Sequence, residues 1–139
     1  MIQRIQSVWL LLAAVCAFLS LKLSFYTGVL LNDAKRSLVP LNSTTTIPIV
    51  ITAVAIGIAS FVIIFLYKDR KMQMRISFAT FLASILLVFL YFSYISKNYL
   101  EGSYDITAPL IFLIPVFLLL ALRGIYKDQK LIKSVDRLR

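Results

Sequence analysis

The sequence contains no histidine and only one cysteine, Cys16. Histidine is the commonest metal ligand and general base, so its absence removes the usual basis of a metal site or a histidine-based triad. A single cysteine excludes an intrachain disulfide. Because Cys16 lies inside an apolar run, we interpret it as a small buried hydrophobic residue. With no phosphate-binding glycine loop either, we predict no cofactor, no metal and no enzymatic activity.

Acidic residues are also scarce, with 6 Asp and Glu against 15 Lys and Arg. None of the six lies at the centre of an apolar run. Coupled transporters usually keep a titratable group within the membrane, and the four-helix small multidrug exporters carry a membrane-embedded glutamate. The lack of one argues against that class.

A net charge of +9 would suggest nucleic-acid binding in a soluble protein. Here the charges flank apolar runs, and the sequence has no groove-reading module. We therefore predict no nucleic-acid partner. We assign the charges to membrane topology and to contacts of the lipid bilayer's anionic headgroups.

Hydrophobic residues make up 60% of the chain and are concentrated in four long runs. About 20 helical residues cross a hydrocarbon core, and a helix satisfies its backbone hydrogen bonds within its own segment. The sequence therefore predicts an all-α integral membrane four-helix bundle with up-down topology, as a single domain over 1–139. The predicted spans are 5–26, 47–67, 76–96 and 106–126, with a long loop at 27–46.

Local signals predict where two of these helices start. Hydroxyl residues at 43–46 precede Pro48, and Asp105 and Thr107 precede Pro109. Hydroxyl or carboxylate caps followed by proline in the first turn are typical of helix N-termini.

The distribution of Lys and Arg predicts the orientation. Eleven flank the runs on the side of the two termini and the second connection, against three in the first and third connections. Positive residues are retained on the cytoplasmic side. We therefore predict a multi-pass protein of the bacterial inner (cytoplasmic) membrane with both the N- and C-termini in the cytoplasm.

The segment 127–139 carries an apolar stripe at helical spacing, formed by Leu131, Ile132, Val135 and Leu138, among basic residues. This pattern predicts a short basic amphipathic helix. Such a helix lies on an anionic leaflet or docks on a protein partner; lipid contact is the simpler interpretation. In the third run, Ser77, Thr80 and Ser84 share one face and indicate close helix contacts.

Three segments resemble an uncharacterised family, the domain-of-unknown-function family forty-two ninety-three. They are the opening MIQRIQSVWLLLA, the basic stretch 68–75 and the ending KDQKLIKSVDRLR. The resemblance implies a small four-span inner-membrane protein of Bacteroidetes-type bacteria and no assigned activity. It also suggests that the terminal motifs matter beyond topology. The candidate partner or lipid contacts are Arg4, Lys68, Arg70, Lys71, Arg75, Asp128, Ser134, Asp136 and Arg137.

These observations favour a non-enzymatic scaffold or accessory subunit that binds an unidentified membrane or cytoplasmic protein at its cytoplasmic face. The alternative is an oligomeric transporter or channel component, a homo-oligomer with a pore lined by Ser77, Thr80 or Ser84. An enzyme acting on lipids is the third hypothesis, and it lacks a catalytic constellation.

Overall fold

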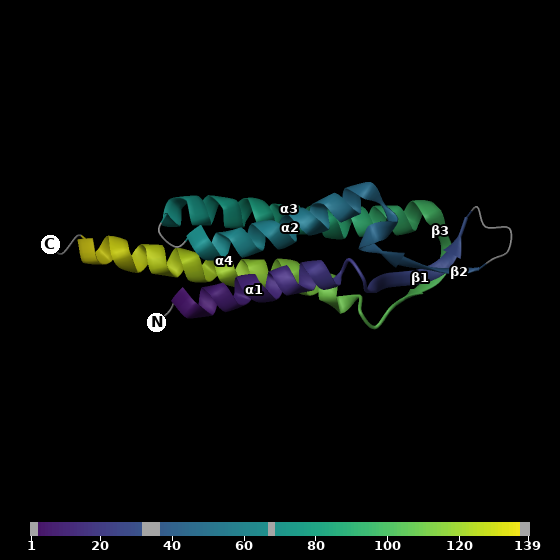
Figure 1. Ribbon diagram of the computed structural model, residues 1–139, viewed down its shortest axis with the longest axis horizontal. Helices are drawn as coiled ribbons and strands as arrows, with labels where there is room; N and C mark the ends of the chain where they lie inside the picture. Colours follow the sequence, from purple (N-terminus) through teal and green to yellow (C-terminus); the bar gives the residue numbers. More distant parts are fainter. Residues whose placement is uncertain (1–2, 32–36, 67–68, 137–139) are drawn as a thin grey trace.

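The computed structural model describes residues 3–31, 37–66 and 69–136, and the side chains within 5–31, 37–66 and 69–131. Within these residues, four α-helices form a bundle in which each packs mainly against two neighbours, in the cyclic order α1, α2, α3, α4 (Figure 1). The helices are α1 (Gln3–Leu19), α2 (Ile47–Phe65), α3 (Arg70–Asn98) and α4 (Pro109–Asp136).

The start of α1 and the end of α4 lie at the same end of the bundle, which we call the terminal end (Figure 1). Three of the helices are long and apolar enough to cross a membrane, whereas the apolar part of α1, Ile5–Leu19, is shorter. In length and composition these three helices are consistent with a membrane protein.

The predicted helix starts are confirmed. Helix α2 begins after Thr46, which is extended, with Pro48 in the first turn. A 3-10 turn, η1 (Ser43–Thr45), precedes it. Helix α4 begins at Pro109. The start of α3 is capped by Asp69, whose carboxylate accepts the backbone N–H of Met72 at 3.4 Å.

The opposite end of the bundle carries an antiparallel sheet, and the all-α prediction is wrong there (Figure 1). Its strands, β1 (Ser24–Leu30), β2 (Leu38–Asn42) and β3 (Tyr99–Tyr104), have the order β2-β1-β3. We call this the sheet end. Strand β1 takes up the end of the predicted first span, and β2 lies in the predicted loop. Because β1 pairs with a strand that follows α3, this pairing leaves no local pattern in the sequence.

The sheet depends on two glycines that face each other across β1 and β3. Gly28 pairs with Gly102, and a Cβ on Gly28 would lie 2.5 Å from the carbonyl oxygen of Glu101 and 2.9 Å from the Tyr26 ring. The missing side chains make room for Tyr26, whose ring packs edge-on against Tyr99 and Tyr104 at 5.3 Å. An aromatic ring laid over strand glycines restores packing that they lack.

Polar and aromatic contacts join the sheet to the helices. The Ser43 hydroxyl donates to Ser20 Oγ at 3.1 Å and forms a second hydrogen bond with the Tyr91 hydroxyl at 2.5 Å. The Phe25 ring lies 4.7 Å from Tyr91. All four side chains are buried, so the sheet continues the core of the bundle.

Three predicted boundaries also need correction. Helix α1 ends at Leu19 because a turn containing Ser20 and Lys22 leads into β1. Helix α3 starts at Arg70, so part of the basic second connection is helical. Helix α4 continues without a break to Asp136, because good helix formers follow Gly124. The separate C-terminal helix is thus the last part of α4.

Candidate functional site

Five of the predicted contact residues lie outside the described side chains. Lys68 and Arg137 lie outside the described residues altogether. Arg4 belongs to α1, and Ser134 and Asp136 belong to the last turns of α4, but only their backbone is described.

The other four predicted residues all lie at the terminal end, in two different environments. Lys71 and Arg75 are exposed on the first turns of α3. Arg70 is half-buried, and Asp128 of α4 is buried with 8% of its surface exposed. Arg70 and Asp128 line one small polar cavity of about 30 Å³. The structure therefore brings together two of the predicted residues, from helices that are far apart in the sequence.

This cavity lies where all four helices meet. Its walls combine α1, α2, α3 and α4, and its polar lining has both amides and charges. We call these polar side chains the polar junction; they are Gln6, Ser7, Arg70, Gln73 and Asp128. The cavity is large enough to hold a water molecule. Its polar lining suits a bridging water between the carboxylate and its neighbours.

One hydrogen bond in the polar junction joins the first and last helices. The Gln6 amide Nε2 donates to Asp128 Oδ2 at 2.5 Å. Gln6 reaches this position because Gly124 lies one turn before Asp128 on α4. A Cβ at Gly124 would lie 2.7 Å from Gln6 Cγ. Gly124 therefore lets α1 approach α4 closely enough for a buried amide to hold a buried carboxylate.

A second amide links α2 and α3. Gln73 is buried, and its Nε2 donates to the backbone carbonyl of Ile63 at 3.2 Å. This carbonyl belongs to the last turn of α2 and also accepts the backbone N–H of Leu66. The two glutamines thus tie both helix pairs together at the terminal end.

Helix α3 continues this polar face into the bundle. Ser77, Thr80 and Ser84 are almost wholly buried, at 0%, 4% and 0% exposure. The hydroxyls of Thr80 and Ser84 donate to carbonyls of their own helix, at 2.8 and 2.6 Å. These side chains therefore face the interior of the bundle.

The residues that sequence reasoning missed are the two glutamines. Gln6 lies at the edge of the first apolar run and Gln73 within the basic stretch, so neither stands out by composition. The sequence does contain a signal for the surface that Gln6 contacts. Gly124 and Asp128 are spaced by four residues and therefore share one face of a helix. Among the described residues, no group of three or more His, Cys, Asp or Glu is arranged to hold a metal ion.

Comparison with known proteins places the chain in a family but assigns it no activity. No curated protein and no solved structure matches it. The model of the family described as "Domain of unknown function (DUF4293)" matches residues 2–138. This is the family that the terminal motifs and the basic stretch resemble. Since the match covers nearly the whole sequence, the chain belongs to the DUF4293 family.

Proposed function

We propose that this protein is a non-enzymatic, multi-pass protein of the bacterial inner membrane that binds a protein partner at its cytoplasmic terminal end. Three helices with the length and apolarity to cross a bilayer support the membrane placement. The charge bias supports the orientation, because eleven of the 15 Lys and Arg belong to the two terminal segments and the second connection of the sequence.

Helix α1 acts as the fourth crossing in this proposal. Its 17 residues are about 25 Å long, slightly less than a hydrocarbon core of about 30 Å. Its packing against α2 and α4 supports a crossing, and the turn that contains Lys22 completes the distance. Lys22 is exposed, so its ammonium group can extend to the headgroups while its stem stays among the chains.

The observation that carries the partner-binding proposal is the course of α4. This helix runs unbroken to Asp136, and its last turns project beyond the other helices at the terminal end (Figure 1). The bond from Gln6 to Asp128 holds α4 just before the projection begins. A helix held rigidly at its base presents a fixed surface, which lowers the entropic cost of binding a partner. The exposed Lys127 and Lys130 make that surface basic.

The proposal is tested by removing the projection without disturbing its base. A chain that stops after Gln129 keeps Asp128 and its bond to Gln6. It should insert and fold like the full chain but lose a partner that co-purifies in mild detergent. A full-length control with Lys127 and Lys130 both changed to Arg keeps the charge and should retain the partner. Recovery of the same proteins by the full and truncated chains would contradict the proposal.

The orientation is tested separately by cysteine labelling. Cys16 is buried, with 8% of its surface exposed, so it gives little background. We expect Ser103→Cys, on the exposed face of β3, to react with a membrane-impermeant maleimide in intact spheroplasts. Lys127→Cys should react only after permeabilisation. The reverse pattern would overturn the proposed orientation.

A further inference from the structure

A cavity at the sheet end lies on the outer surface of α3 and α4, close to where β3 passes into α4. It has a volume of about 660 Å³. Its walls are apolar and include Phe92 of α3 and Phe112 and Val116 of α4. These side chains are 41%, 42% and 50% exposed. From Pro109 to Val116 the helix rises about 10 Å, so the cavity extends well into the apolar zone of a membrane.

One charged group lines this cavity, and it is held in place. The Asp105 carboxylate accepts from the Thr27 hydroxyl, with oxygen–oxygen distances of 3.0 and 3.1 Å. Its backbone N–H donates to the carbonyl of Phe25 at 3.2 Å. Both partners belong to β1, so the sheet fixes the carboxylate. None of the described residues that line the cavity is Lys or Arg, so among them Asp105 has no cation beside it.

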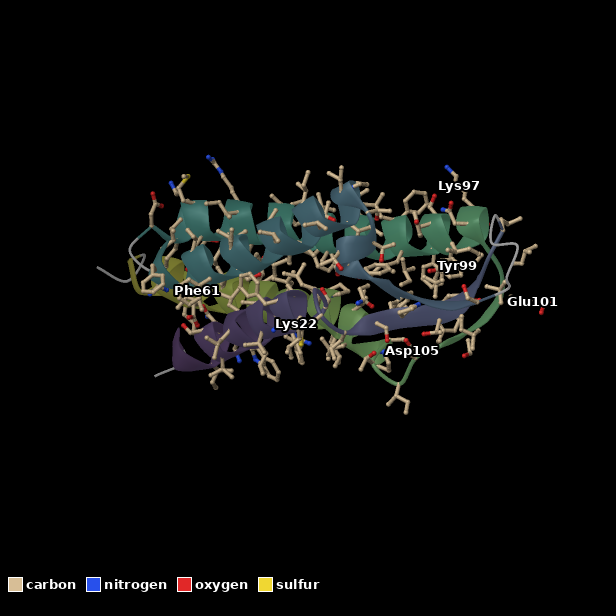
Figure 2. All side chains as sticks on the ribbon, turned by 45° about the vertical axis from the view of Figure 1, so that its right-hand side comes forward. Lys22, Phe61, Lys97, Tyr99, Glu101 and Asp105 are labelled. Atoms are coloured by element: carbon tan, nitrogen blue, oxygen red, sulfur yellow. The ribbon has the colours of Figure 1, made fainter. Side chains whose placement is uncertain are left out.

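A second cavity at the sheet end has the opposite charge. It lies between α2 and α3, has a volume of about 440 Å³, and is lined by Lys97 together with Thr45 and Thr46. Figure 2 shows Lys97 and Asp105 on opposite sides of the molecule, with Glu101 farther out on β3. Lipids with different headgroups would thus meet two different electrostatic environments at the same end of the protein.

We propose that the Asp105 cavity binds a phospholipid whose headgroup carries a primary ammonium, such as phosphatidylethanolamine. One acyl chain lies along Phe112 and Val116, and the ammonium group donates to the Asp105 carboxylate. An apolar wall about 10 Å deep beneath a single fixed anion matches this combination of tail and cation. A phosphatidylglycerol headgroup has no cation, and its negative charge would be repelled by Asp105. This inference rests on the proposed membrane placement, but not on the partner or on the orientation.

The test compares lipid binding by native mass spectrometry of the full-length protein in mild detergent, with phosphatidylethanolamine and phosphatidylglycerol of identical chains. The wild-type protein should retain phosphatidylethanolamine preferentially. Asp105→Asn keeps an acceptor for Thr27 and removes the charge, and it should weaken phosphatidylethanolamine binding about fivefold. Glu101→Gln removes the same charge from an exposed position of β3 outside the cavity and should leave binding unchanged.

A cavity-filling variant tests the acyl site independently of charge. Val116→Trp places a large ring in the apolar wall and should reduce retention of phosphatidylethanolamine, while Leu119→Trp, on an exposed face outside the cavity, should not. Equal retention of both lipids by the wild type would overturn the proposal. So would equal effects of Asp105→Asn and Glu101→Gln, because the preference would then reflect overall charge. The tail truncation acts at the other end of the molecule, so failure of the partner proposal is distinguishable from failure of this one.

Discussion

The two ends of the bundle are held together by different means. At the terminal end, two glutamine side chains join helices through hydrogen bonds to Asp128 and to the carbonyl of Ile63. At the sheet end, backbone pairing, facing glycines and a cluster of aromatic rings join β1 to β3. Side chains at the terminal end have room to adjust, whereas at the sheet end backbone lies against backbone. The two ends should therefore tolerate substitution to different degrees.

The largest effect is expected for Gly28→Ala at the sheet end. The new Cβ would lie 2.5 Å from the Glu101 carbonyl oxygen, so the strands must separate. Overpacking of this kind costs about 3 kcal/mol of unfolding free energy. Thermal unfolding in detergent measures it, with Ser103→Ala on the exposed face of β3 as the control. Equal melting temperatures for the two variants would contradict the rigid packing proposed for the sheet end.

Asp128→Ala should have the next largest effect. It leaves the buried Gln6 amide without its acceptor, at a cost of about 2 kcal/mol. The half-buried neighbour Gln129 supplies the control variant Gln129→Ala. A double-mutant cycle with Gln6→Ala isolates the pair, and the two substitutions should be clearly less than additive. Full additivity would show that Gln6 and Asp128 do not act together.

Gly124→Ala is the matching glycine-to-alanine substitution at the terminal end, to be compared with Gly28→Ala at the sheet end. Its Cβ meets the flexible Gln6 side chain at 2.7 Å, and alanine gains up to about 1 kcal/mol of helix propensity over glycine. We expect a net loss below about 1 kcal/mol in unfolding measurements. In the Gln6→Ala background the same change should be neutral or stabilising. A loss as large as that of Gly28→Ala would contradict the contrast between the two ends.

The smallest effect is expected at alkaline pH and only at the sheet end. Burial raises the pKa of Tyr99 above its ordinary value of 10.0, and the neighbouring Tyr94 and Tyr26 add to the increase. The unfolded chain therefore ionises at lower pH than the folded one. The resulting stability is complete below pH 10 and is lost as the pH rises through the raised pKa. The melting temperature of the wild type should fall there relative to that of Tyr99→Phe, and parallel curves would contradict the assignment.

Local sequence patterns predict some elements of this fold and miss others. The helix starts at Ile47 and Pro109 were predictable because proline in the first turn of a helix is a local signal. The apolar runs likewise predicted α2, α3 and α4. The apolar neighbourhood of Tyr26, in contrast, predicts a membrane span. Its actual place in β1 depends on pairing with Tyr104, a partner that no sequence window contains.

The candidate site divides in the same way. Composition and charge alone put Arg70, Lys71, Arg75 and Asp128 at one end of the molecule, because basic flanks follow the limits of apolar helices. Only the packed structure separates them, leaving Lys71 exposed and burying Asp128 against Gln6. The sequence by itself determined the long helices and their charged end, since both depend on local apolarity and charge. The tertiary structure decided the sheet, the polar junction and the cavity at Asp105, since each depends on distant segments meeting.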